Sequence, residues 1–500
     1  MAVSFNNIPN NIRVPLFYAE VDNSKANSAS VVKKSLIIGQ MTIDGSASEG
    51  VATLISSTTQ AKKKFGRGSQ LALMAEAYRN QDTSGELWCL PMAVTGTVAS
   101  STVVVKGTAL ESGTIALYIG STKVPVTVAK GELASVVATS MVSAVNSNSD
   151  LPVTAETSTV EGGSGVTLTV KSVGAYGNDI LVGLNLQGSV GGEENINGIT
   201  VETSAFEDGA GIINYENAFK AVETETWYYI GIGDSDATSL DACKAEMQDS
   251  TGRWSYARMQ YGHVFTAKRG DAESLVTFGG TRNDQHVSVF GMEEKNPNPT
   301  WIIAGAVLGR AAAYFSIDPA RPLQTGPLNE IMATPLESRF GFNEQNTLLS
   351  HGIATMYVTS GTVMIQRCIT TYQVNSFGDP DNSYLDTTTM FTLAEIITTL
   401  KTAITSKYPR HKLANDGTRF GPGQAIVTPS VIRSELIAQY ASMETKGLVE
   451  NADLFAKYLI VERNADDPNR IDVLLPPDLV NQLRIFALQA QFRLQYSAND

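Results

Sequence analysis

The stretch WYYIGIGDSDATSLDACKAEM, residues 227–247, decides the fold class. It opens with Trp227–Gly231, an apolar and aromatic run that is typical of a buried strand. A short turn rich in glycine and aspartate follows, and Ser239–Met247 is predicted to be a helix. A strand that leads through a tight turn into a helix is the repeating unit of α/β proteins.

The same alternation of strand and helix recurs on both sides of this stretch. Lys34–Gly39 and Trp88–Pro91 have the pattern of short buried strands, and Ser69–Arg79 between them has the pattern of a helix. His263–Ala267 is predicted to be a further strand. The sequence therefore predicts an α/β fold, with a mostly parallel or mixed sheet and helices on its faces.

Two helix starts are predicted towards the C-terminus. Thr392 and Glu395 have the spacing of a capping box, and apolar residues follow them at helical spacing. Thr428 precedes Pro429, and proline is favoured at the first position of a helix.

The segment Gly96–Ala205 has a composition unlike the rest of the chain. It contains no Arg, His, Cys or Trp, and its nine acidic residues outnumber its four lysines. Its runs of Val, Thr and Ile predict strands, and about Glu132–Asn146 predicts one helix. We therefore predict a small, mostly β domain at residues 96–205, inserted into the larger α/β body.

Both ends of the chain are predicted to be extended. Near the C-terminus, apolar and polar residues alternate over eleven residues, which predicts a strand with one apolar face, roughly 36 Å long. This run has no hairpin partner after it, so it needs a sheet edge in its own chain or in another subunit. The predicted apolar positions of the two ends are Val14, Leu16, Tyr18, Phe486, Leu488, Phe492, Leu494 and Tyr496.

Composition and charge exclude several function classes. The 500 residues include 37 Lys and Arg against 50 Asp and Glu, so the net charge is −13. Such an acidic chain lacks the clustered cations that bind nucleic acid or an anionic membrane surface. Residues 1–11 have no signal-peptide pattern, and the longest apolar run, Trp301–Gly309, is too short to span a bilayer. We expect a soluble protein made in the cytosol, with no nucleic-acid partner and no direct membrane insertion.

No catalytic, cofactor or metal site is predicted. The three cysteines lie far apart and form no CxxC pair. His263, His286 and His351 are isolated in the sequence, and we interpret each as a hydrogen-bonded structural residue. The chain contains neither a P-loop motif nor a GxSxG nucleophile motif.

The turn Gly231–Asp234 lies where a dinucleotide-binding fingerprint would lie, between a strand and a helix. Asp236 replaces the third glycine of that fingerprint, and its carboxylate would oppose a phosphate. We interpret the turn as a tight connection with an Asp or Ser helix cap. A nucleotide-binding α/β enzyme remains the alternative.

Three cations, Lys407, Arg410 and Lys412, cluster beside His411 in this acidic chain. The simpler interpretation is a solvated helix end, where cations face the negative pole of the helix dipole. The functional interpretation is contact with an acidic partner.

Several stretches carry a family likeness when taken together and in order. They are Phe65–Leu71, Glu111–Gly120, Gly174–Ile180, Asp318–Gln324, Lys407–Ala414, and Val461–Asn464 with Pro468–Arg470. In these stretches the chain resembles the contractile tail sheath proteins of Mu-like bacteriophages, over nearly its full length. None of the stretches is a catalytic signature. One position departs from the family pattern, because Gly326 stands where a larger apolar residue is expected.

The resemblance implies how the chain is divided. It implies an N-terminal arm at residues 1–20 and a C-terminal strand arm at residues 481–500. Between them, residues 21–95 and 206–480 would form one sheath core from both halves of the chain. Residues 96–205 would form an outer, protruding domain.

The resemblance also implies what the protein does. Sheath proteins of this kind assemble as hexameric rings stacked helically around a tail tube, and their terminal arms add strands to sheets of neighbouring subunits. Contraction of the sheath drives the tube through the host envelope during genome ejection. The implied partners are further copies of the chain, the tail tube protein, and the baseplate and tail terminator proteins. The implied location is the virion tail, after assembly in the host cytoplasm, with no enzyme activity and no cofactor.

A second alternative to the sheath is another viral assembly protein, such as a capsid or tail-tube subunit. Extended apolar ends would suit these proteins too. The α/β body favours the sheath, because tail-tube proteins are smaller and mostly β.

Overall fold

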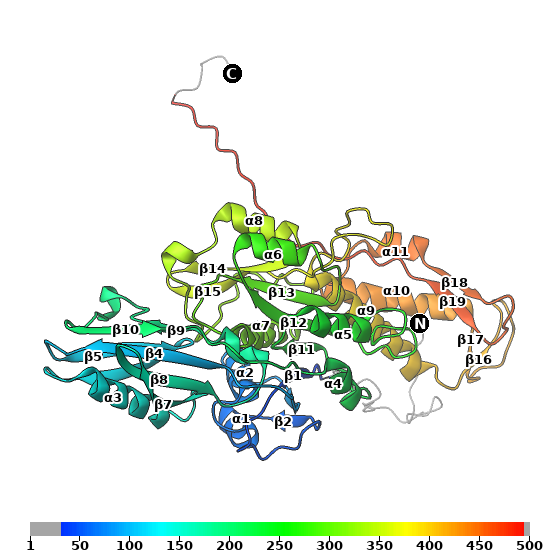
Figure 1. The fold of residues 1–500 in the computed structure, drawn as a ribbon. Helices are drawn as coiled ribbons and strands as arrows, with labels where there is room; N and C mark the ends of the chain where they lie inside the picture. Colours follow the sequence, from blue (N-terminus) through cyan, green and yellow to red (C-terminus); the bar gives the residue numbers. More distant parts are fainter. Residues whose placement is uncertain (1–31, 495–500) are drawn as a thin grey trace, which may run out of the picture.

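The computed structural model describes residues 32–494, and an eight-stranded mixed sheet forms its centre (Figure 1). The strand order is β15-β14-β13-β12-β11-β1-β3-β2, with β2 and β15 antiparallel at the edges and the other strands parallel. The strands are β1 (Ser35–Gly39), β2 (Thr53–Ile55), β3 (Leu87–Pro91), β11 (Tyr229–Ile232), β12 (His263–Arg269), β13 (Val287–Met292), β14 (Ile353–Thr359) and β15 (Thr362–Arg367). The predicted α/β class and the mixed sheet are confirmed.

Helices cover both faces of this sheet. Along β1, Ile37 joins the core cluster shared with α2 and α7, whereas Leu36 and Ile38 join the cluster shared with α4 and α5. Successive side chains of a strand point to opposite faces, so a fully apolar strand needs helices on both sides. The helices of the body are α1 (Thr58–Phe65), α2 (Gln70–Arg79), α4 (Tyr215–Ala221), α5 (Ala237–Met247), α6 (Ala272–Gly279), α7 (Thr300–Phe315) and α8 (Phe342–Ser350), with a 3₁₀ turn, η3 (Leu336–Ser338).

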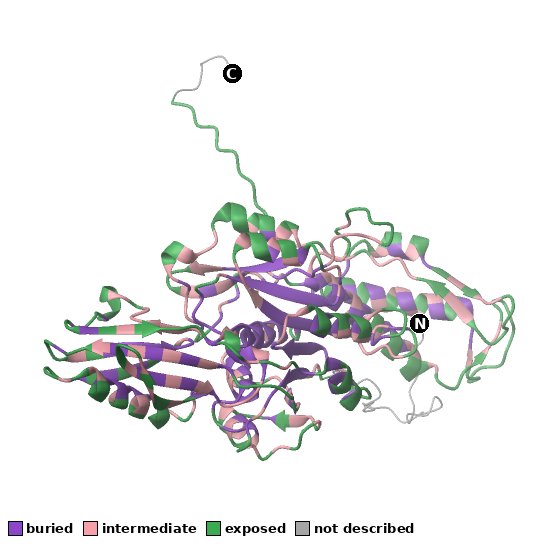
Figure 2. Cartoon of the chain, viewed as in Figure 1, coloured by how far each residue is buried: buried purple, intermediate pink, exposed green. Residues whose placement is uncertain are grey.

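Helix α7 is buried along most of its length, between the sheet and α2 (Figure 2). Two glycines one turn apart let α7 and α2 approach closely. A Cβ atom on Gly305 would lie 2.6 Å from the Met74 carbonyl oxygen, and one on Gly309 would lie 2.5 Å from the Tyr78 carbonyl oxygen. Both distances are shorter than any ordinary contact, so side chains at these positions would push the two helices apart.

A β-rich unit lies between β3 and α4 in the sequence and extends away from one end of the central sheet (Figure 1). Its strands form two antiparallel sheets, with orders β10-β4-β8-β7 and β6-β5-β9. Its elements are β4 (Ser100–Gly107), β5 (Gly113–Ile119), β6 (Thr122–Val128), α3 (Ala134–Ser147), β7 (Val153–Val160), β8 (Gly163–Val170), η1 (Ala175–Asp179), β9 (Val182–Leu184), η2 (Ser189–Gly191) and β10 (Ile199–Thr203). The strands and the helix predicted in this stretch are present.

Two groups of contacts join this β-rich unit to the body. On one side, the Arg67 guanidinium donates to the Asp150 carboxylate at 2.9 Å. On the other side, Arg269 Nε donates to Asp179 Oδ1 at 2.7 Å, and the Asp179 carboxylate also accepts from the backbone N–H at the start of α7. Charged pairs on both sides therefore hold the unit against the body.

The chain continues from β15 into a C-terminal part made mostly of helices. Its elements are α9 (Thr387–Lys407), β16 (Lys412–Leu413), β17 (Ile426–Val427), α10 (Pro429–Thr445), α11 (Ala452–Tyr458), β18 (Ile460–Arg463) and β19 (Ile471–Leu474). Helix α10 begins at Pro429 with Thr428 as its N-cap residue, as predicted.

The predicted start of α9 is wrong. The helix begins at Thr387 rather than near Thr392, with Asp386 as its N-cap residue. Phe391 is buried against Tyr229 and Phe315, with ring centroids 5.3 Å and 4.7 Å away, and this burial extends the helix towards the sheet. The local capping signal is therefore overridden by tertiary packing.

Gly326, the position that departs from the family pattern, lies beside the edge strand β15. Its carbonyl accepts from the Ile365 N–H at 2.9 Å. A Cβ atom there would lie 3.2 Å from Cγ of Arg310, which is mostly buried, so the stem of Arg310 occupies the space beside the missing side chain.

The close approach of α7 and α2 gives a stability prediction. We expect Gly305→Ala to lower the free energy of unfolding by about 1–2 kcal/mol, because overpacking outweighs the helix-propensity gain of alanine. Gly280→Ala is the control, since a methyl group at that position would have its nearest neighbouring atom 3.5 Å away. Urea unfolding measures both variants, and equal values for the two would contradict the prediction.

Candidate assembly site

The C-terminal segment after β19 first follows the body, where Leu479 bridges to Val449, and it leaves the body as an extended chain after Arg484 (Figure 1, red). From Ile485 to Leu494, every large apolar side chain is at least 77 % exposed. The structure assigns no strand here, because the segment has no ladder partner among residues 32–494. The apolar residues predicted for the strand Phe486–Tyr496 are exposed as far as Leu494, but within the part of the chain that the structure describes they join no sheet. Pairing of this segment with another subunit stays a prediction.

Some predicted arm residues lie outside the described residues. These are Val14, Leu16 and Tyr18 of the N-terminal segment and Tyr496 at the C-terminal end. The four other predicted C-terminal positions, Phe486, Leu488, Phe492 and Leu494, are described and are all solvent-exposed.

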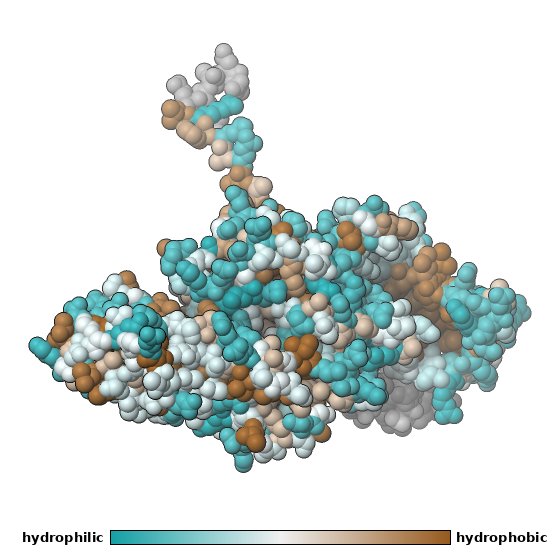
Figure 3. Space-filling model, in the orientation of Figure 1, coloured by the Kyte–Doolittle hydropathy of each residue, from teal (hydrophilic) through white to brown (hydrophobic). Residues whose placement is uncertain are grey.

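The hairpin β18–β19 is a sheet of only two strands. The strands pair antiparallel, with Ile460 opposite Leu474, and in the described part of the chain no third strand joins them. Val461 packs towards the α10 core, whereas Ile460 and Leu474 are 50 % and 62 % exposed. A patch of apolar surface lies near α11 and β18, and the tip of the molecule beyond it is hydrophilic (Figure 3). A two-stranded sheet with exposed edges and apolar residues is a ready acceptor for a further strand.

The predicted cationic cluster is divided in two by the structure. Lys407 ends α9 and forms an ion pair with Glu435 at 2.6 Å, inside its own chain. Burial alone would raise the pKa of Glu435, but the hydrogen bonds from Lys407 and Gln439 lower it below its usual value. Arg410 lies on the exposed connection after the helix, and Lys412, also exposed, begins β16 and donates to the Gln424 side chain at 3.2 Å. Lys407 therefore has a structural role, and only the other two cations remain available to a partner.

The glycine turn after β11 is filled by protein side chains. A Cβ atom on Gly231 would lie 2.7 Å from Leu308 of α7, and one on Gly233 would lie 2.5 Å from the Gln70 side chain. Asp236 caps α5 by accepting from the Ser239 N–H at 3.0 Å, as predicted. These glycines make room for helix packing, which does not support the nucleotide-binding alternative.

The three predicted structural histidines are all hydrogen-bonded. His263 Nε2 lies 2.8 Å from Ser288 Oγ, His286 Nε2 lies 2.9 Å from an Asp249 oxygen, and His351 Nδ1 lies 2.7 Å from the Thr347 carbonyl oxygen. Burial lowers the pKa of His263 well below its usual value, so its ring is neutral. Over residues 32–494, no group of three or more His, Cys, Asp or Glu side chains is placed to hold a metal ion. No helix in the same range is long and apolar enough to cross a membrane.

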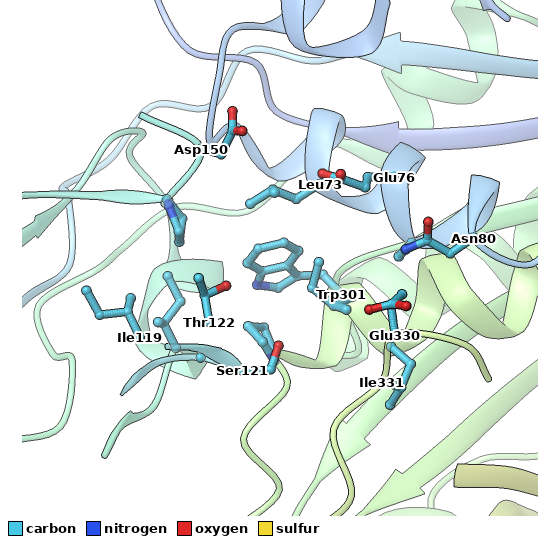
Figure 4. Close-up of a pocket in the computed structure, with 16 residues that line it drawn as sticks. Leu73, Glu76, Asn80, Ile119, Ser121, Thr122, Asp150, Trp301, Glu330 and Ile331 are labelled. Atoms are coloured by element: carbon cyan, nitrogen blue, oxygen red, sulfur yellow. The ribbon is translucent and has the colours of Figure 1, made fainter. Parts of the chain in front are cut away.

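A cavity of about 140 Å³ lies where the β-rich unit meets α2 and α7 (Figure 4). Leu73, Ile119 and the ring of Trp301 line it, and Glu76 and Asp150 lie at its rim. Both carboxylates are held by Lys62, at 3.0 Å and 3.3 Å. These carboxylates are thus committed to the joint between the β-rich unit and the body.

Sequence reasoning missed the contacts at the base of the C-terminal segment. Arg484 and Gln482 bind the body through Asp386, Gln324 and Thr388. The partners are separated from them by about a hundred residues or more. The only local signal was a pair of polar residues just before the alternating run.

Comparison with known proteins matches this fold. Two family models match the chain: the phage tail sheath protein central domain over residues 208–371 and the phage tail sheath C-terminal domain over residues 379–493. The chain is 39 % identical over 499 residues to the Mu-like prophage FluMu tail sheath protein of Haemophilus influenzae, covering 99 % of this chain and 100 % of that protein.

Two crystal structures share the fold at low sequence identity. The sheath tail protein of Desulfitobacterium hafniense matches with a TM-score of 0.50 and 11 % identity, over 94 % of this chain and 97 % of that one. The sheath tail protein of Listeria innocua matches with a TM-score of 0.50 and 13 % identity, over 92 % and 96 %.

The buried carboxylate of Asp234 gives a pH prediction. Burial raises the pKa of Asp234 to about 6, although the hydrogen bond from Tyr215 acts to lower it. The carboxyl group therefore ionises less readily in the folded chain than in the unfolded chain, and the fold loses stability as pH rises from about 4 to 6. We expect Asp234→Asn to remove this loss, with a gain in unfolding free energy of at most about 3 kcal/mol at pH 7 and little gain at pH 4. Urea titrations at the two pH values measure it, and an equal gain at both would contradict it.

The divided cationic cluster gives a second prediction. We expect Lys407→Glu to lower the unfolding free energy by about 1 kcal/mol, because it places a second carboxylate beside Glu435. The double variant Arg410→Glu/Lys412→Glu should stay within about 0.5 kcal/mol of the wild type, since both side chains are exposed. Thermal and urea unfolding compare the three proteins, and a larger loss in the double variant would be inconsistent with this division.

Proposed function

This chain belongs to the phage tail sheath family, and we propose that its copies assemble as hexameric rings stacked around a tail tube. It is a structural subunit of a contractile phage tail, similar to the sheath proteins of Mu-like phages. The proposal adds how the subunits join, what drives contraction and which partners take part.

The observation that carries the proposal is a donor and an acceptor on different parts of one chain. The donor is the exposed apolar segment that leaves the body after Arg484, beside Asp386 at the start of α9. The acceptor is the open hairpin β18–β19 at the far end of the C-terminal part (Figure 1). A contact between two different surfaces is heterologous, so it repeats from copy to copy and yields rings or helical assemblies. That is the symmetry a sheath requires.

The energetics favour such a contact. Each large apolar side chain of the segment that becomes fully buried contributes about 1.5–3 kcal/mol. Added strand pairing would satisfy backbone groups of the segment and of the hairpin edges. The N-terminal arm with Val14, Leu16 and Tyr18 is proposed to join neighbouring sheets in the same way.

We propose that contraction draws its free energy from these interfaces. Leu308 and Gln70 pack against the glycines of the turn that resembles a nucleotide site, so these glycines serve helix packing and give no support for a fuel molecule. The extended sheath is then a metastable state, and the contracted state buries more surface. A few hundred Å² more per subunit would supply several kcal/mol at about 25 cal/mol per Å². Contraction would drive the tube through the host envelope during genome ejection.

The proposed partners follow from the same assembly. They are further copies of the chain, the tail tube protein, and the baseplate and tail terminator proteins, within a virion tail assembled in the host cytoplasm. Arg410 and Lys412 are proposed to contact the tube or an acidic face of a neighbour. A contact of this kind weakens as salt concentration rises.

Assembly tests the proposal directly. We expect a chain that lacks residues 486–500 to fold but to form no tubes, because the donor strand is gone. A finer variant changes Phe486, Leu488, Phe492 and Leu494 to Ser and should also fail. Its matched control changes Ala487, Gln489 and Gln491 to Ser, on the other face of the same strand, and should assemble.

Negative-stain electron microscopy and sedimentation velocity at high protein concentration distinguish the outcomes. Tubes or stacked rings from the wild type and the control alone would support the proposal. Tubes from the truncated chain would refute the role of the segment. Uniform small particles from every variant would argue against self-assembly through these surfaces.

A further inference from the structure

The C-terminal segment is joined to the body at a defined place just before it becomes exposed. Gln482 donates to the Ala320 carbonyl oxygen at 3.2 Å and to the Thr388 hydroxyl. Two residues later, Arg484 donates to Asp386 at 2.9 Å and to Gln324 at 3.2 Å. The next residue, Ile485, is already 79 % exposed. Leu483, between the two anchoring residues, is also 75 % exposed, so bound and exposed side chains alternate up to Arg484, the last residue of this bound stretch.

Asp386 holds two guanidinium groups at once. Arg367 contacts both carboxylate oxygens, at 3.1 Å and 2.9 Å, and Arg484 Nη2 contacts Oδ1 at 2.9 Å. The side chain of Arg484 is only 12 % exposed and that of Asp386 20 %. Two like charges this close are stable only with the carboxylate between them, so Asp386 is the centre of the arrangement.

The position of Asp386 in the fold makes this contact a rigid one. Asp386 is the N-cap residue of α9, yet its side chain forms no cap hydrogen bond, because both oxygens face arginines. Arg367 ends β15, the edge strand of the central sheet. Through Asp386, Arg484 is thus connected to the longest helix described and to the main sheet.

We propose that Asp386 and Arg484 form a clamp that sets where, and in which direction, the C-terminal arm leaves one subunit to reach a second copy of this chain. The inference rests on the proposed function, in which that arm is the donor strand. Arg484 is a positioning residue: it touches no neighbour itself but determines where residues 485–494 begin. Those ten residues extend about 33 Å at 3.3 Å per residue, so the arm can contact a neighbour only within about 33 Å of the clamp.

The clamp also defines a path for force. A pull on the arm during contraction acts first on Arg484, and a charged pair with little solvent access resists it better than the exposed segment beyond. The load then passes to α9 and β15 rather than peeling residues 475–484 from the body. An arm that departs from a fixed point gives every subunit the same geometry, which a regular helical assembly needs.

Spin-label distance measurements test the clamp. The three native cysteines are all buried, so labels attach selectively to cysteines introduced at Phe486, just beyond the clamp, and at Lys401. Lys401 is exposed and lies 15 residues along α9 from Asp386, roughly 22 Å at 1.5 Å per residue. The labelled chain is mixed with an excess of unlabelled chain, so that only distances within one subunit are read.

Three variants separate positioning from general stability. Arg484→Met keeps an apolar stem but removes the link between arm and Asp386. Arg367→Met removes the other cation from the same carboxylate and leaves the arm attached. Arg484→Lys keeps one charged contact. Thermal unfolding of each variant verifies that the body is folded.

We expect one narrow distance peak in the wild type, its loss in Arg484→Met, and its retention in Arg367→Met and Arg484→Lys. In electron micrographs, Arg484→Met should give shorter and less regular tubes than the wild type. A peak in Arg484→Met as narrow as in the wild type would overturn the clamp, as would equal broadening in Arg367→Met. A wild-type chain that forms no tubes would instead refute the proposed function, while the distances would still decide the clamp.

Discussion

Strand β1 is hydrogen-bonded on both of its edges, to β3 before the β-rich unit and to β11 after it. This double pairing brings two parts of the chain, separated by more than a hundred residues, into one sheet. The intervening unit must therefore leave and return at neighbouring points, and the bridge between Thr97 and Ala210 closes it there. The β-rich unit can thus project from the body without interrupting the central sheet, and the charged pairs at Asp150 and Asp179 keep it in one orientation.

The parts of the fold that could be predicted from the sequence are those whose signal is local. Strand β1 and helix α10 have runs of apolar spacing and a proline start that depend on few distant contacts. The start of α9 could not be predicted, because the burial of Phe391 against three distant elements outweighed a local capping box. The glycine turn also depends on a distant contact. Position 233 must be glycine because the Gln70 side chain, from more than 160 residues earlier in the chain, packs where a Cβ atom would lie.

Only part of the candidate assembly site could be predicted from the sequence, because the rest depends on contacts between distant residues. The alternating run at 486–494 is a local pattern, and its large apolar side chains are exposed in the single chain. In the proposed assembly the run becomes a strand only against a second copy of the chain, and a single subunit does not contain that copy. The contact between Arg484 and Asp386 could not be predicted, because the two residues are 98 positions apart in the sequence and neither belongs to a periodic pattern or a motif.

The distribution of charge explains why the molecule can be acidic and still build ordered contacts. Several cations are used inside the chain: Lys407 pairs with Glu435, Lys62 with Asp150, and Arg269 with Asp179. Intramolecular pairs of this kind orient parts of the subunit, whereas the terminal segment carries a run of large exposed apolar residues and the open hairpin carries further ones. In the proposed assembly, ion pairs set orientation within each subunit and apolar strands supply the cohesion between subunits. The proposed contraction requires these contacts to exchange while the subunit stays rigid, and this division allows it, because apolar contacts are non-directional whereas ion pairs depend on geometry.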